Sequence, residues 1–415
     1  MRCLLLALEN AGASLAERRM ETRMALTVAR VMRDGGRMAP FVVCSRGGLL
    51  ADSLRDLKIP HLAIGAGRVA ETLAALRLRW RCRHWRGLLI QTFGQASVPL
   101  GNAVRRLRPK GTTLLAHAFL MAPPSRALLQ GRWRRNLVAA DCILCGSGHV
   151  RDRLAEHGVD APTPQGPGER RLRLLPPVVD GESAGLLDIS PAAAEEGRHF
   201  VFCMRESLLP RSGAALVTRA MAALWQRADL PPWEVRFYGG GDRFMEVFEE
   251  ARSLGVTSRL SLLGEQDETV MKAALAQAHA CLAPGSSPEE APATLWTGLA
   301  AGLPTIVSRG ALHEERLRHC EDAVLFFEEG NPQALAEAMI TLMHDAALRH
   351  ALAERGRAAA LHRLPDDAAR DLCAFFESWY TRRGWVIRPE QVAASPEEAA
   401  GDADTPSADD EGRDA

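Results

Sequence analysis

Residues 283–307 read APGSSPEEAPATLWTGLAAGLPTIV. Ala283 ends an apolar run, and an acidic loop and then a helical run follow it. The helical run stops at Gly302, and a second apolar run resumes after Pro304. This order predicts a strand, a loop, a helix and a further strand. Amides at the start of such a helix can bind phosphate, and a loop carboxylate can accept hydrogen bonds from sugar hydroxyls. The alternative is an ordinary β–loop–α–β unit without a ligand.

The same alternation of short apolar runs and helical runs extends over most of the chain. In the second half we expect strands at residues 199–204, 233–238, 260–263, 280–283 and 305–307. In the first half we expect them at residues 3–8, 40–44, 61–64, 88–92, 113–117 and 142–145. Such alternation is typical of parallel sheets, so we predict an α/β protein of two Rossmann-like parallel domains joined by a linker.

The domain boundaries follow from changes in composition. A stretch rich in Ala, Gly, Ser and Pro at residues 181–197 separates a first domain, 1–183, from a second, 184–371. A last helix is placed at 372–388. Residues 389–415 are acidic and nearly devoid of bulky apolar side chains, and we predict that this tail is disordered because it buries too little surface to offset its ordering entropy.

The composition excludes several classes of protein. Apolar residues make up 47% of the 415 residues, which excludes wholesale disorder. No apolar run approaches the roughly 18 uncharged residues of a membrane span. Nine cysteines, an odd number, favour reduced thiols in the cytoplasm over a disulfide framework. Gly65 and Gly67 have the spacing of a dinucleotide-binding turn, but no acidic residue follows at about 20 residues, so no NAD site is expected.

Charge is unevenly distributed, although the formal net charge is zero. Residues 1–183 carry 29 Lys and Arg against 14 Asp and Glu, which indicates an anionic partner. The densest basic segment comprises Arg77, Arg79, Trp80, Arg81, Arg83, Trp85 and Arg86. Arg with Trp suits an anionic membrane surface or a phosphorylated glycolipid acceptor. The alternatives are a solvated helix face whose tryptophans pack inward, and nucleic acid, which no recognition motif supports.

Two arginines follow the strand expected at residues 199–204. Arg205 ends this strand, and Arg211 stands just before a helix. Two guanidinium groups beside a strand end and a helix N-terminus can bind a pyrophosphate, although two surface arginines near a loop are also commonplace. Glycine turns after the next two strands, at Gly239 and Gly264, would let a ligand approach the backbone closely.

The order of elements from Phe200 to about Leu361 resembles the donor-binding domain of the family 4 retaining glycosyltransferases. These proteins have the GT-B fold, so the resemblance implies two Rossmann-like domains that face each other across a cleft. The resemblance rests on the strand with its arginine, the two glycine turns, the acidic loop after Ala283, the helix that ends at Gly302, and the segment 322–339. It covers nearly the whole second domain, and it depends on the joint order and spacing of these motifs.

The resemblance implies roles for individual residues. Arg205 and Arg211 would neutralise the diphosphate leaving group, and Arg211 stands where the family usually has Lys. Glu289 matches the first Glu of the family's paired-Glu signature and would be a catalytic residue that contacts the donor sugar. The second Glu of that signature, which usually binds the nucleotide ribose, is replaced by Thr297.

Further positions resemble the family less closely. Glu290 and Ala291 continue the donor-binding loop, and Pro292 follows them, where the family has Gly-Phe-Gly. In the first domain, Gly12 follows the first strand, where the family has a glycine-rich loop near the diphosphate. His117 ends a strand where such enzymes often place an active-site His, although a lone His at a strand end is more often structural.

As a whole, the resemblance implies a metal-independent retaining glycosyltransferase without a cofactor. It would move a sugar from a nucleotide diphosphate sugar to a glycan or lipid-linked acceptor, in cell-surface polysaccharide or lipopolysaccharide synthesis. We expect a cytoplasmic protein, peripheral on the anionic inner face of the plasma membrane, with a last helix that crosses back to the first domain.

The replacements at Thr297, Met204 and Pro292 favour an alternative function. This is a catalytically silent GT-B protein that binds a sugar nucleotide, or a partner in a polysaccharide-assembly complex. An epimerase or phosphorylase on the same fold is less favoured, because neither a further catalytic acid motif nor a lysine context for a cofactor is evident.

Overall fold

The computed structural model describes residues 1–9, 15–48, 50–85, 87–108, 113–119, 129–160, 172–175, 185–191, 199–206, 208, 213–241, 243–285 and 291–383. The acidic tail predicted at residues 389–415 lies outside these ranges. Among the described residues, no helix has both the length and the apolar character that a membrane crossing requires.

The first unit is a seven-stranded sheet in the order β3-β2-β1-β4-β5-β6-β7, in which every neighbouring pair is parallel. Its strands are β1 Arg2–Ala7, β2 Ala39–Ser45, β3 His61–Ile64, β4 Leu88–Phe93, β5 Thr113–Phe119, β6 Cys142–Cys145 and β7 Leu172–Leu174. Its helices are α1 Leu15–Asp34, α2 Ala51–Asp56, α3 Arg68–Arg81, η1 Gln95–Ser97, α4 Val98–Arg106, α5 Gly131–Val138 and α6 Gly148–Glu156.

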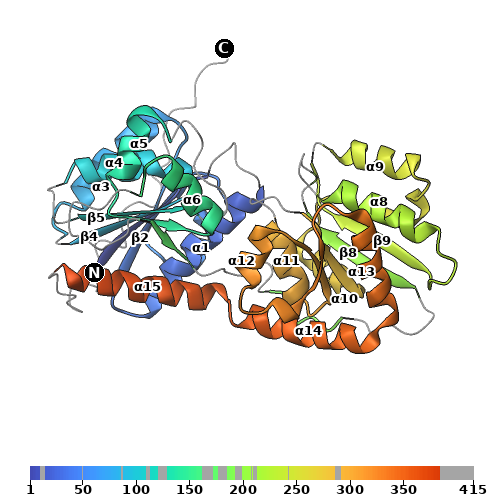
Figure 1. Ribbon diagram of the computed structural model, residues 1–415. Coiled ribbons are helices and arrows are strands. Elements are labelled where there is room, and N and C mark those ends of the chain that lie inside the picture. The colour runs from blue at the N-terminus through green and yellow to red at the C-terminus, as the bar shows by residue number, and fades with distance from the viewer. Residues whose placement is uncertain are drawn as a thin grey trace, which may run out of the picture.

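The second unit is a six-stranded parallel sheet in the order β10-β9-β8-β11-β12-β13. Its strands are β8 Phe200–Arg205, β9 Trp233–Tyr238, β10 Leu260–Leu262, β11 Ala280–Ala283, β12 Thr305–Arg309 and β13 Leu325–Glu328. Its helices are α8 Ala214–Trp225, α9 Phe244–Ser253, η2 Thr257–Arg259, α10 Glu268–Ala276, α11 Ala291–Ala300, α12 Ala311–Leu317, η3 Glu321–Ala323, α13 Pro332–His344 and α14 Ala346–Leu361. Figure 1 shows the two units side by side, so the predicted pair of parallel α/β sheets is confirmed.

The strands form where apolar residues run without interruption, because a parallel sheet is covered on both faces. β1 illustrates this rule. Leu4 and Leu6 pack into the core beneath one face of the sheet, and Cys3 and Leu5 pack into the core of the opposite face, which α1 covers. Since successive side chains alternate between faces, a continuous apolar run is what such a strand requires.

Each sheet contains a point at which the strand order reverses. β1 pairs with β2 on one side and with β4 on the other, and β8 pairs with β9 and β11 in the same way. In open α/β sheets, ligands bind outside the carboxyl ends of the strands at such a reversal. The ends of β1 and β8 are therefore where the topology places a ligand.

Helix α15, Pro365–Arg382, leaves the second unit and runs along the first (Figure 1). Its residues Leu372, Phe376 and Trp379 are buried in the same core as Met24 and Val28 of α1. The predicted return of the last helix to the first unit is thus observed. The helix begins at Pro365 rather than at 372, since proline is well suited to the first turn of a helix.

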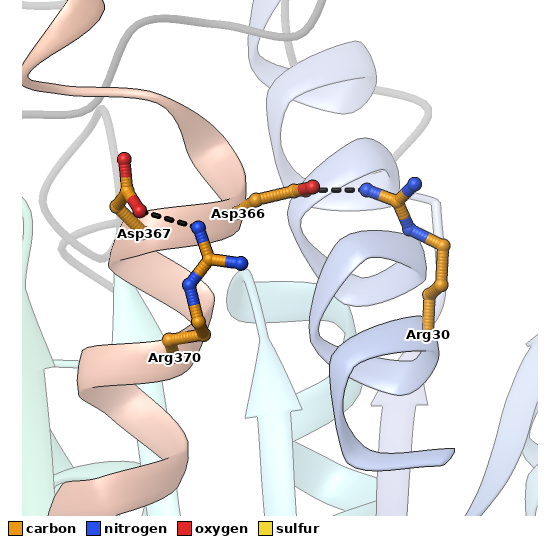
Figure 2. A network of polar contacts seen from close by, with 4 residues as sticks. All are labelled: Arg30, Asp366, Asp367 and Arg370. Carbon is orange, nitrogen blue, oxygen red and sulfur yellow. Dashed lines mark hydrogen bonds and ion pairs between the residues drawn. The ribbon is translucent and has the colours of Figure 1, made fainter. Parts of the chain in front are cut away.

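One ion pair also joins α15 to α1. Figure 2 shows Arg30 of α1 paired with Asp366, and beside it Arg370 paired with Asp367 within α15. Both side chains of the first pair are 41% exposed, so the pair contributes at most about 1 kcal/mol. Apolar packing, rather than this contact, holds the crossing helix in place.

Candidate functional site

Arg205 is the last residue of β8, at the reversal point of the second sheet. Its half-buried side chain donates a hydrogen bond from Nη1 to Thr297 Oγ1 at 3.3 Å. Thr294 Oγ1 donates in turn to the backbone carbonyl of Arg205. These contacts fasten α11 to the end of β8, so the guanidinium group lies at the crevice where this topology binds ligands.

Thr297 occupies the inner face of α11 and has no exposed surface. Its hydroxyl contacts Arg205 of β8. The preceding residue of α11, Trp296, is also fully buried. In this conformation the residue supports the arginine and presents no surface to a ribose.

The start of α8 and the loop after β11 approach each other closely. The carboxylate of Glu206, just after β8, accepts a hydrogen bond from the amide of Gly213 at 3.0 Å. A Cβ added at Gly213 would lie 2.4 Å from Pro284 Cγ, and one at Gly285 would lie 2.2 Å from Glu206 Oε1. At Gly213 the neighbours are a proline ring and the backbone of Gly285, so a side chain would force Pro284 and Gly285 away from the start of α8.

The two predicted glycine turns also meet at this edge. The amide of Gly239, after β9, donates to the carbonyl of Gly264, after β10, at 2.8 Å. The amide of Leu208 donates to the carbonyl of Gly240 at 2.9 Å. The turns that follow β8, β9 and β10 are therefore joined, and Gly264 adopts a φ of +70°, which favours glycine.

Several predicted site residues lie outside the described residues. These are Gly12, Arg86, Arg211, Glu289 and Glu290. Ala291 is the first residue of α11. The roles given to these residues stay predictions, whereas Arg205, Gly239, Gly264 and Thr297 are brought together at one edge of the sheet.

His117 lies inside the first unit. β5 continues past it to Phe119, and its ring has no exposed surface. Thr92 Oγ1 lies 2.8 Å from Nδ1, and Asn102 Nδ2 lies 3.4 Å from Nε2. Burial lowers the pKa of His117 to about 3, so the ring is neutral at physiological pH. Because the ring cannot touch a sugar in this conformation, the geometry favours the structural role.

The basic segment of the first unit lies on α3 and the turn after it. Arg77, Arg79 and Arg83 are exposed. The guanidinium of Arg81 lies 4.5 Å from the ring centroid of Phe41. Trp85 is buried, as the solvated-face alternative expects, whereas Trp80 is exposed and lies against Arg83.

A row of exposed apolar side chains accompanies these arginines on α3. Val69, Leu73, Leu76 and Trp80 are each at least half exposed. We call these four residues the apolar stripe of α3. The stripe was not predicted, although its spacing of three to four residues, which places all four side chains on one helix face, is visible in the sequence.

The second unit is similar to a known family of proteins. Residues 188–359 match the family model described as glycosyl transferases group 1. The matched segment contains Arg205 and Thr297. One curated relative is an exopolysaccharide phosphotransferase of Streptomyces coelicolor, 27% identical over 158 residues, which are 37% of this chain and 16% of the relative. This chain therefore corresponds to a small part of that relative's length.

Solved structures match most of the chain. The Anabaena protein HepE in complex with UDP and glucose has a TM-score of 0.68 at 17% identity, over 91% of this chain and 100% of that chain. A trehalose-6-phosphate synthase, analysed for glycosyl transfer with retention, has a TM-score of 0.63 at 11% identity, over 91% and 99% of the two chains. The fold is GT-B. At these low identities, the similarity to solved structures shows the fold alone. The GT-B fold was predicted from the order of motifs in the second domain.

Proposed function

We propose that this GT-B protein is a retaining glycosyltransferase that moves a sugar from a nucleotide diphosphate sugar to a glycan or lipid-linked acceptor. The observation that carries the proposal is Arg205 at the end of β8, bonded to α11 within the segment that matches the group 1 glycosyltransferases. The UDP and glucose of HepE support the donor class, and the trehalose-6-phosphate synthase supports retention. The exopolysaccharide relative supports a role in cell-surface polysaccharide synthesis.

The chemistry follows from charge. When the bond between the anomeric carbon and the diphosphate breaks, negative charge collects on the departing phosphate. A preorganised guanidinium stabilises that charge, and Arg205 would supply it together with Arg211, which precedes α8 in the sequence. Glu289 in the loop before α11 would accept hydrogen bonds from the sugar hydroxyls. We propose that these side chains act without a metal ion or other cofactor.

We also propose that the outer face of α3 lies on an anionic membrane surface that carries the acceptor. The apolar stripe lies beside Arg77 on the outer face of α3, and Arg83 follows in the turn after this helix. Such a helix binds in the plane of a membrane interface, with its apolar face in the lipid and its arginines at the phosphates. The proposal places the protein in the cytoplasm, at the inner face of the plasma membrane.

Transfer can be tested directly with the purified chain. UDP-, GDP- and ADP-sugars are incubated with a lipid-linked glycan acceptor, with and without EDTA, and products are measured by mass spectrometry. We expect one donor class to react equally well in EDTA, and NMR to show the donor's anomeric configuration in the product. Inversion would contradict the retaining assignment, and no transfer from any donor would contradict the enzymatic one.

One observation favours a second function, a catalytically silent protein that binds a sugar nucleotide. Thr297 stands where the family signature has a carboxylate, and its hydroxyl is buried against Arg205. A thermal shift with a nucleotide sugar in the absence of any turnover would support this function. Turnover with the same donor would exclude it.

A further inference from the structure

A cavity of about 1210 Å³ lies between the two units, where α6 meets α12. Its walls on the first unit are α6 and the end of β7, and its walls on the second unit are α12, η3 and α14. Figure 1 shows α6 and α12 on the facing sides of the two units. The described donor residues Arg205, Gly239 and Gly264 are not part of these walls, so the cavity is separate from the candidate donor site.

Arg316 of α12 lines this cavity and is only 5% exposed. Its Nε has no hydrogen-bond partner, and no carboxylate in the described ranges forms an ion pair with it. Burial lowers the pKa of the guanidinium to about 10, with a smaller opposing effect of Glu315, so the group is still charged at neutral pH. A buried charge without a counter-ion is costly, and a bound anion would remove that cost.

The carboxylates of the cavity wall do not supply this counter-ion. Glu315, the neighbour of Arg316 in sequence, accepts a hydrogen bond from the amide of Gly148 on the first unit at 2.6 Å. Glu329 is exposed. The remaining two carboxylates are in ion pairs, Asp152 with Arg151 and Asp322 with Arg355.

His313 lies one turn before Arg316 on α12 and is 1% exposed. Its Nδ1 is 2.9 Å from the carbonyl oxygen of Ser308 and 3.1 Å from the hydroxyl of the same residue. Since the nearer oxygen only accepts hydrogen bonds, we assign the hydrogen to Nδ1. Burial lowers the pKa of His313 to about 4, which keeps the ring neutral. Nε2 is then a hydrogen-bond acceptor, and it has no partner. Two residues of α12 in the wall of this cavity therefore carry a cation and an unused, buried acceptor.

We propose that this cavity binds an oxyanion, a phosphate or a carboxylate, that is carried by a hydroxylated carbohydrate. Arg316 pairs with the oxyanion, and Nε2 of His313 accepts a hydrogen bond from a neighbouring hydroxyl. α12 follows β12, which is separated from β8 by β11 in the sheet, so the cavity lies near the edge that holds Arg205. The ligand is then the anionic part of the sugar acceptor. This assignment rests on the proposed function, whereas the binding of an anion in the cavity does not depend on it.

Thermal unfolding of the full chain with four probes tests this site. Glucose 6-phosphate, glucuronate and inorganic phosphate carry an oxyanion, and glucose is the neutral control. We expect glucose 6-phosphate, glucuronate or both to raise the unfolding temperature more than inorganic phosphate, and glucose to have no effect. The larger of the two sugar responses tells whether the oxyanion is a phosphate or a carboxylate.

The Arg316→Met variant separates a ligand site from a structural arginine. Without a ligand we expect it to unfold at the same or a higher temperature than the natural chain, because an uncompensated buried charge is removed. We expect its affinity for the effective probe to fall at least about tenfold, because a charge-assisted hydrogen bond is lost. Arg316→Lys should retain part of the response, and His313→Phe should abolish the preference for the sugar-bearing anion over inorganic phosphate.

Three results would overturn the proposal. The first is that no oxyanion probe stabilises the natural chain, and the second is that the probes stabilise Arg316→Met as much as the natural chain. The third is that Arg316→Met, measured without a ligand, unfolds at a lower temperature than the natural chain. Arg205→Ala is the matched control, since it should lose stabilisation by a nucleotide sugar and keep the response to glucose 6-phosphate. If no nucleotide sugar stabilises the protein but the Arg316-dependent response persists, the cavity stands as an anion site and the proposed transfer is wrong.

Discussion

The two units share a parallel sheet topology but place their candidate polar residues at different depths. In the second unit, Arg205 ends β8 and stays half-buried beside α11. In the first unit, His117 is followed by two more residues of β5 and is completely buried. A side chain at the last position of a strand can reach a ligand at the sheet edge, whereas one further inside supports the sheet.

The largest expected effect comes from Arg205→Ala. Removal of a guanidinium that stabilises the leaving group should lower the rate of sugar transfer about 10²–10³-fold, because charge stabilisation of this kind is worth about 3–4 kcal/mol. The rate is measured with saturating donor and acceptor. The control is Arg252→Ala, an exposed arginine of α9 paired with Glu249, which should leave the rate unchanged. Equal rates for the two variants would show that Arg205, at the end of its strand, has no more effect on transfer than an exposed surface arginine.

His117→Ala should have the opposite pattern. Loss of the ring leaves a cavity and deprives the buried Thr92 hydroxyl of its partner, which should lower the free energy of unfolding by about 2–3 kcal/mol. Urea unfolding measures this change, and the transfer rate of the folded variant should stay within a few-fold. A stable variant with a severely reduced rate would show that His117 acts in catalysis after all.

The stability of the protein at several pH values tests whether the ring of His117 is buried and neutral. Its pKa is lowered to about 3 in the folded chain, so between pH 6.5 and 3 the unfolded chain binds a proton that the folded chain does not. Stability should therefore fall with decreasing pH across this range, by up to about 1.4 kcal/mol per pH unit from this residue. His117→Gln should show a shallower dependence than the natural chain in urea unfolding at pH 7, 6 and 5. Parallel curves would contradict a neutral, buried ring.

The smallest expected effect concerns the outer face of the first unit. Arg77→Gln should weaken binding to vesicles that contain phosphatidylglycerol about fivefold, because one arginine at an anionic surface contributes about 1 kcal/mol. Sedimentation with vesicles measures the partition coefficient. Pure phosphatidylcholine vesicles and the Arg252→Gln variant are the controls. If the natural chain binds both kinds of vesicle equally, charge on α3 does not direct the protein to membranes.

Much of the fold could be predicted from the sequence, because buried parallel strands require uninterrupted apolar runs. The strand expected at residues 233–238 coincides with β9, whereas the last helix, expected at 372–388, begins seven residues earlier, at Pro365. The short strand β7, Leu172–Leu174, was not predicted, since it has two exposed residues and follows no long apolar run. Nor was α2, Ala51–Asp56, which is less than two turns long.

The candidate sites were harder to predict, because burial depends on tertiary packing. His117 was placed at a strand end, but Ala118 and Phe119 extend β5 by two apolar residues and draw the ring into the core. Arg316 stands in the polar sequence His-Glu-Glu-Arg, which is typical of an exposed helix. It is buried because α12 contacts α6 and shares the wall of one cavity with η3 and α14, and no local sequence pattern predicts contacts between residues so distant in the chain.

The central claim is that Arg205 contacts the diphosphate of the donor. A crystal structure of the full chain with the nucleoside diphosphate that stabilises it most tests this claim directly. We expect a phosphate oxygen to lie within about 3.2 Å of the Arg205 guanidinium, at the start of α11. A nucleotide bound elsewhere, or one bound in the crevice while Arg205 contacts only Thr297, would contradict it.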